Sequence, residues 1–116
     1  MSNDEPQTVI AIYRVRADQE DAFFDLLRRH HPTLLELGLA TCDPPVVYRG
    51  AERDPEGPIV FEIFSWVSED APRVAHQTPE VGRVWEAMGT MCEERGPGKP
   101  KFTFPHVERV EMTPTA

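Results

Sequence analysis

Residues 59–66 read IVFEIFSW and form the most strand-like segment of the chain. Isoleucine, valine, phenylalanine and tryptophan all favour extended backbone. Residues 42–49 (CDPPVVYR) predict a preceding strand that opens at Pro44 and Pro45. The charged segment 51–57 (AERDPEG) holds an Asp-Pro pair and a glycine, so it predicts a hairpin loop between the two strands.

The segment before the hairpin predicts a strand followed by a helix. Residues 8–16 (TVIAIYRVR) are rich in β-branched residues and predict the strand. Asp18 stands where a helix N-cap would, and Pro32 predicts a kink near His31. Gly38 is a natural stop for the helix. The apolar positions between them recur at helical spacing: Phe23, Leu26, Leu27, His30, Leu34 and Leu37.

The segment after the hairpin predicts two helices and a last strand. Ser68 can cap a short helix over 69–75, and Thr78-Pro79 begins a second helix that ends by Gly96-Pro97-Gly98. Residues 101–112 predict a long final strand. The order is β-α-β-β-α-β, with the second α divided. We therefore expect an α+β, ferredoxin-like fold, an antiparallel sheet with helices on one face.

Length and charge limit what the protein does. The chain has 116 residues and a formal net charge of −8, which suits one domain and poorly suits nucleic acid or anionic lipid. We expect a single domain over 8–112, a disordered polar lead over 1–7 and a flexible tail over 113–116. No apolar run predicts a membrane span or a signal peptide, so we expect a cytoplasmic protein. Cys42 and Cys92 are predicted to be free thiols.

Both faces of the predicted sheet are apolar, although helices can cover only one. In the first strand Val9, Ala11, Tyr13 and Val15 alternate with Ile10 and Ile12. Because an exposed apolar sheet face is unfavourable, we expect a homodimer formed through it. Glu62, Arg14 and His106 also project from the strands, and polar groups on apolar surroundings are typical of a ligand site.

Two segments carry a resemblance to a known superfamily. Residues 62–68 (EIFSWVS) and 75–80 (AHQTPE), with the opening TVIAIYRVR and the PTLLELG of residues 32–38, resemble the antibiotic biosynthesis monooxygenase-like dimeric α+β barrels over residues 8–112. The resemblance implies a homodimer and a cofactor-independent monooxygenase. Its partners would be O₂ and a quinol or aromatic polyketide-like small molecule, without cofactor or metal.

The sequence departs from two branches of that superfamily. Quinol monooxygenases often carry a second histidine just after Thr-Pro, where this chain has Glu80. The haem-degrading branch uses an asparagine on the first strand, and residues 8–16 contain none. This absence counts against haem degradation.

Such an oxygenation needs a base, and two residues are candidates. His76 is one, because histidine titrates near neutral pH; alternatively it bonds a free backbone group at a helix end. Glu62 is the other. Alternatively, Glu62 orients a histidine or arginine, or forms an ion pair with Arg14 or Arg16.

The predicted pocket is aromatic. Trp66 and Phe64 would contact a planar ring, Tyr13 would donate a hydrogen bond, and His106 would face the cavity. Each also has a structural alternative in sheet, core or interface packing, as do Tyr48 and Trp85. His30 and His31 are adjacent, so they lack the i, i+4 spacing of a helical metal pair. The alternative to a monooxygenase is a non-catalytic dimeric module that binds a small molecule or serves in assembly.

Overall fold

The computed structural model describes residues 5–114, so the predictions for residues 1–4 and 115–116 lie outside it. Strands β1 (Gln7–Arg14), β2 (Val46–Glu52) and β3 (Gly57–Trp66) pair with β4 (Phe102–Thr103) and β5 (His106–Val107). The strand order is β2-β3-β1-β4, and β5 also pairs with β1. Every pairing is antiparallel. This is the predicted ferredoxin-like sheet, with its last strand divided.

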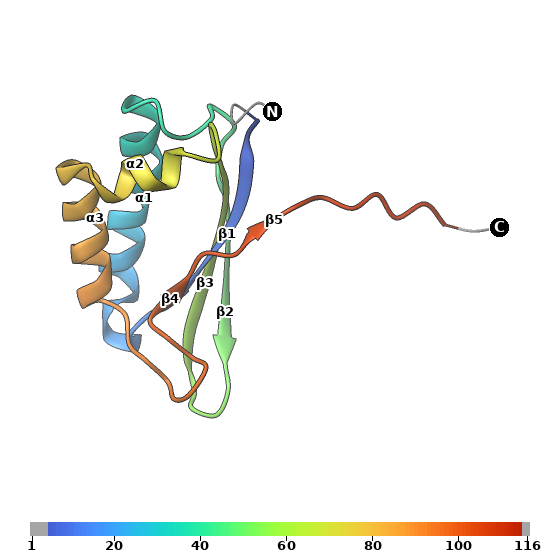
Figure 1. Cartoon of the computed structure of the whole chain (residues 1–116). Helices are drawn as coiled ribbons and strands as arrows, with labels where there is room; N and C mark the ends of the chain where they lie inside the picture. The colour runs from blue at the N-terminus through green and yellow to red at the C-terminus, as the bar shows by residue number, and fades with distance from the viewer. Residues whose placement is uncertain (1–4, 115–116) are drawn as a thin grey trace.

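The helices lie together on one face of the sheet (Figure 1). They are α1 (Glu20–Glu36), α2 (Ala71–His76) and α3 (Pro79–Thr90), and a 3₁₀ turn, η1 (Ala17–Gln19), precedes α1. Asp18 lies within η1, so the prediction that it caps the helix is wrong. Gly38 has φ +74°, which is the left-handed conformation expected of a glycine that follows a helix. Among residues 5–114, no helix is both long and apolar enough to cross a membrane.

Strict alternation along the strands separates the two faces of the sheet. Val60, Glu62, Phe64 and Trp66 of β3 are buried under the helices, together with Val9, Ala11 and Tyr13 of β1. The intervening residues form the opposite face, which we call the outer face. It consists of Ile10, Ile12, Val46, Tyr48, Phe61 and Ile63, which are cross-strand neighbours. The core therefore lies between the sheet and the helices, as the sequence predicts.

The last strand differs from its prediction. Instead of one strand over 101–112, two short strands are separated by Phe104 and Pro105, and residues 108–114 extend away from the sheet (Figure 1). Proline has no N–H for the ladder. Val107 is already paired with Thr8, next to the first residue of β1, so β1 offers no further length to pair with. Val110 and Met112 are consequently exposed.

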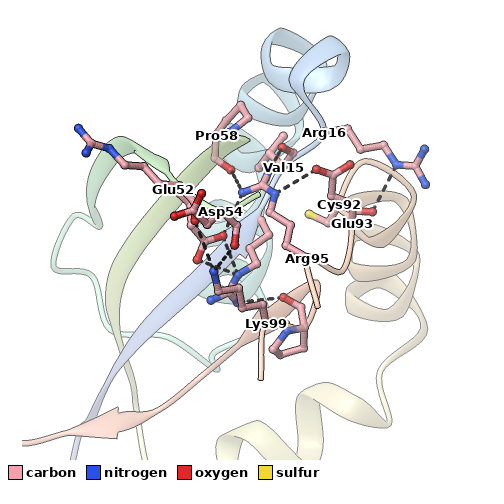
Figure 2. Close-up of polar contacts among 12 residues, drawn as sticks. Val15, Arg16, Glu52, Asp54, Pro58, Cys92, Glu93, Arg95 and Lys99 are labelled. Carbon is pink, nitrogen blue, oxygen red and sulfur yellow. Dashed lines mark hydrogen bonds and ion pairs between the residues drawn. The ribbon is translucent and has the colours of Figure 1, made fainter. Parts of the chain in front are cut away.

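One arginine closes the end of the sheet opposite β5 (Figure 2). The side chain of Arg95 is 1% exposed, and its guanidinium bonds groups from β2, from β3, from the residue that follows β1 and from its own loop. It donates to Val15 O at 2.7 Å, Pro58 O at 2.9 Å, Glu93 Oε2 at 3.0 Å and Glu52 Oε1 at 3.3 Å. A buried charge needs such full pairing, so Arg95 fixes the chain between α3 and β4.

Candidate functional site

A buried chain of hydrogen bonds connects the sheet to two helices. Tyr13 Oη donates to Glu62 Oε1 at 2.8 Å, and His30 Nδ1 lies 2.8 Å from the same oxygen. Trp85 Nε1 donates to His30 Nε2 at 2.9 Å. Glu62 and His30 are each 1% exposed. The chain therefore joins β1 and β3 to α1 and α3 through the core.

The positions of the protons in this chain of hydrogen bonds follow from which atoms can donate and which can accept. An indole nitrogen only donates, so His30 Nε2 accepts and the neutral ring carries its proton on Nδ1. That N–H donates to Glu62, whose Oε1 thus receives two hydrogen bonds. Glu62 Oε2 is buried and has no partner among the described residues. Glu62 is thereby held in place by one oxygen while the other remains available.

Tyr13 is fixed as a donor. Burial raises the pKa of its hydroxyl well above the ordinary value, and the nearby Glu62 carboxylate raises it further. Both effects disfavour a phenolate. Tyr13 therefore stays protonated and serves Glu62, with its hydroxyl already engaged.

A small aromatic cavity of about 220 Å³ lies beyond His30. We call it the aromatic cavity; its walls include His30, Phe64, Trp66, His76, Trp85, Phe104 and His106. Trp66 is 4% exposed, and its indole N–H is buried without a partner among the described residues. A buried N–H without a partner is costly, so an acceptor supplied by a ligand would stabilise it.

The aromatic rings around this cavity pack edge to face and in stacks. The His76 and Trp85 ring centroids are 4.8 Å apart, and those of Phe64 and Trp66 are 5.1 Å apart. Trp85 stacks on Phe104 at 6.3 Å with an interplanar angle of 29°. His76 and His106 are exposed, so they stand where the cavity meets solvent.

The structure brings together four of the six site residues proposed from the sequence. His76, Phe64, Trp66 and His106 line the aromatic cavity. Glu62 contacts it only through His30, and Tyr13 lies one hydrogen bond further back. Tyr13 is therefore not a wall of the aromatic cavity.

Of the alternatives proposed for Glu62, the pairing with a histidine is confirmed and the ion pair with Arg14 or Arg16 is wrong. Arg14 pairs with Glu52 at 3.0 Å, and Arg16 donates to the carbonyl of Cys92. The histidine is His30, which the sequence places in the apolar row of the first helix but does not pair with Glu62. The signal was its place in the apolar row of α1, where a histidine needs a buried partner.

A second cavity, of about 420 Å³, lies on the other side of Glu62 between α1 and β2. We call it the α1–β2 cavity. Glu62, Leu27 and His31 are its buried walls, whereas Arg28, Pro32 and Val47 stand at its exposed rim. Among residues 5–114, no cluster of three or more His, Cys, Asp or Glu side chains is arranged to bind a metal ion.

Comparison with known proteins identifies the fold. No protein-family model and no curated protein matches the sequence. A solved dimeric ferredoxin-like protein of unknown function from Jannaschia sp. CCS1 matches with a TM-score of 0.61 and 13% identity, covering 90% of this chain and 99% of its own. A protein from Bacteriodes thetaiotaomicron VPI-5482, provisionally named an antibiotic biosynthesis monooxygenase, matches with a TM-score of 0.58 and 11% identity, covering 99% and 97%.

These matches define a class by its fold. The chain has the ferredoxin-like α+β fold shared with antibiotic biosynthesis monooxygenase-like proteins, as the resemblance in the sequence predicts. At such low identity the likeness concerns the fold, whereas the chemistry depends on the residues of the site.

Proposed function

We propose that this protein is a cofactor-independent monooxygenase that oxidises a quinol or a related aromatic hydroxy compound in the aromatic cavity. One observation carries the proposal: the cavity combines aromatic walls, an imidazole and a buried indole N–H without a partner. The fold neighbour named as a monooxygenase supports the reaction class.

Each residue has a role in this proposal. His76 accepts the proton of the substrate hydroxyl at the mouth of the cavity. The Trp66 N–H donates to the oxygen as it becomes negative. Trp85 and Phe64 hold the ring, and Phe104 and His106 limit the cavity on the side of the last strand. Glu62 and Tyr13 act through His30, which fixes the position of Trp85.

The substrate and O₂ are the reactants, and the side chains supply only the base and the hydrogen-bond donor. The deprotonated quinol transfers one electron to O₂, and the two radicals combine to form a carbon–oxygen bond as a hydroperoxide. Loss of water from the hydroperoxide leaves the oxidised ring. One quinol and one O₂ thus give one hydroxylated quinone and one water. Apolar walls favour this sequence because they keep solvent from the reactive anion.

We also propose that the protein is a homodimer formed through the outer face. Tyr48 is 61% exposed and Val46 is 48% exposed, beside the isoleucines and phenylalanine of that face. A second copy related by a two-fold axis would cover this apolar surface. The neighbour from Jannaschia is described as dimeric, which supports the proposal.

The two free cysteines fit the reducing cytoplasm expected from the sequence.

Oxygen uptake tests the proposal directly. The protein would be mixed with 1,4-naphthohydroquinone or anthrone in an oxygen electrode, and autoxidation would be subtracted. We expect uptake that falls about 100-fold in His76→Ala, which loses the base, and about 100-fold in Trp66→Phe, which loses the donor. Gln77→Ala changes the exposed neighbour of His76 and should leave the rate unchanged.

Three outcomes contradict the assignment in different ways. Equal rates in all four proteins would remove His76 and Trp66 from the mechanism. Saturable binding of the quinol without uptake would favour the non-catalytic binding module. Absence of both binding and uptake would contradict a quinol or anthrone as the substrate.

A further inference from the structure

We infer that the α1–β2 cavity is a second binding site, and that it takes an apolar organic ammonium ion, such as an arylalkylamine. The inference does not rest on the proposed oxygenase activity, because it concerns a different cavity and its test measures binding. It starts from the buried carboxylate of Glu62, which lines the cavity.

Glu62 has an unused acceptor in a place where water is scarce. Its Oε1 is occupied by Tyr13 and His30, whereas Oε2 has no partner among the described residues. The walls around it include Leu27 and Phe24. A buried polar atom in apolar surroundings is costly unless a donor reaches it, so the cavity favours a ligand that brings one.

The charge around Glu62 favours a cationic donor. His30 is a neutral ring because its Nε2 accepts from the indole of Trp85. Arg14 of β1 pairs with Glu52, and Arg16 donates to the carbonyl of Cys92. Arg28 at the rim is paired with Asp25 at 2.8 Å. A buried carboxylate without a cation is unfavourable, and an ammonium group would supply both the charge and the hydrogen bond. The formal net charge of −8 also attracts cations to the chain.

The size and a second acceptor in the cavity agree with an amine. His31, another wall of the cavity, lies with Nε2 2.9 Å from the Thr41 carbonyl, so Nε2 carries a proton and a neutral ring would offer Nδ1 as an acceptor. An ammonium group has three donors and can use more than one acceptor. The volume of about 420 Å³ accommodates one aromatic ring and a short alkyl chain.

Calorimetric titration with matched probes tests the inference. The probes are 2-phenylethylammonium chloride and 2-phenylethanol, which share their apolar part and differ in charge. We expect the ammonium ion to bind roughly tenfold or more tightly than the alcohol, because hydrogen bonds to charged groups are stronger. In Glu62→Gln, which removes the charge and keeps an oxygen for Tyr13 and His30, this preference should disappear.

A second variant locates the site if Glu62→Gln fails to fold. Val47 lies on the edge strand β2 at the exposed rim and pairs with Glu62 across the sheet. Val47→Phe should therefore fold and fill the cavity, which would abolish binding of both probes. The inference is wrong if the wild-type protein binds the two probes equally or binds neither. Ammonium binding that persists in Val47→Phe would also overturn it, because the site would then lie elsewhere.

Discussion

His30 Nδ1 lies 2.8 Å from Glu62 Oε1, and this contact joins α1 to β3 between two cavities. Each of the two side chains accepts a hydrogen bond from a further residue: Glu62 from Tyr13 and His30 from Trp85. A carboxylate in an apolar core is thereby held by two side chains, one of which is in turn held by Trp85. The pair thus has a structural role in the core in addition to its place in the walls of the two proposed binding sites.

The stability of the fold should depend on His30 far more than on His76. His30→Leu would leave Trp85 Nε1 without its acceptor and Glu62 Oε1 with one donor fewer, both in the core. We expect the free energy of unfolding to fall by about 2–4 kcal/mol. Urea denaturation followed by tryptophan fluorescence measures it. His76→Leu, at an exposed position, should cost less than about 1 kcal/mol. Similar losses in the two variants would contradict the role given to His30.

The protein should lose stability at alkaline pH through two buried groups. Burial raises the pKa of Cys92 from 9.0 to about 11, and burial with Glu62 raises that of Tyr13 well above 10.0. In both cases the folded state holds a proton that the unfolded state has already released. The stabilisation is therefore complete below about pH 9 and is lost progressively as the pH rises through the folded-state values.

Urea midpoints at about pH 8 and about pH 10.5 measure this loss. Cys92→Ala removes one titrating group and Tyr13→Phe removes the other, so each variant should show a smaller difference between the two midpoints than the wild-type protein. Equal differences in all three proteins would mean that other groups cause the loss of stability at alkaline pH.

The alternation within residues 59–66 explains why the sequence predicts the fold and much of the aromatic cavity. With a period of two, Glu62, Phe64 and Trp66 must share one face of a strand, and the helices cover that face. His76 reaches the same cavity because the short helix α2 follows directly after β3.

Other features could not be predicted because they depend on remote pairs. The partner of Glu62 is 32 residues away on α1, and periodicity indicates only that His30 faces the core. The last strand was predicted too long because its residues alternate suitably, whereas its actual length is limited by where β1 begins. Strand length is thus a property of the pair rather than of one segment.

The two cysteines should differ in reactivity. Cys42 is exposed, whereas Cys92 is buried and its raised pKa keeps it as an inert thiol. Ellman's reagent at about pH 8 should modify one thiol per chain in the native protein and two after unfolding in guanidinium. Cys42→Ser should abolish the native reaction. Rapid modification of that variant in the folded state would show that Cys92 is accessible.

The proposed dimer should depend on side chains of the outer face and not on side chains of the face that the helices cover. Tyr48→Asp places a charge on the outer face beside Phe61, whereas Val47→Asp places one on the opposite side of the same strand. We expect Tyr48→Asp to sediment as a folded monomer and Val47→Asp to remain dimeric, because a charge buried at an interface is costly. A wild-type protein that sediments as a monomer would contradict the proposal, as would a dimeric Tyr48→Asp.

The end of the sheet should be sensitive to a single methyl group at Gly57. A Cβ atom at this position would overlap the guanidinium of Arg95, which is buried among its acceptors and cannot move without leaving them (Figure 2). We expect Gly57→Ala to lower the free energy of unfolding by about 2–4 kcal/mol. Gly50→Ala is a matched control from the facing strand, since its Cβ would meet Ile59 at an ordinary 3.6 Å. Neither glycine has a positive φ, so backbone strain contributes to neither result. If the two variants unfold at the same urea concentration, the packing of Arg95 against Gly57 does not hold this end of the sheet.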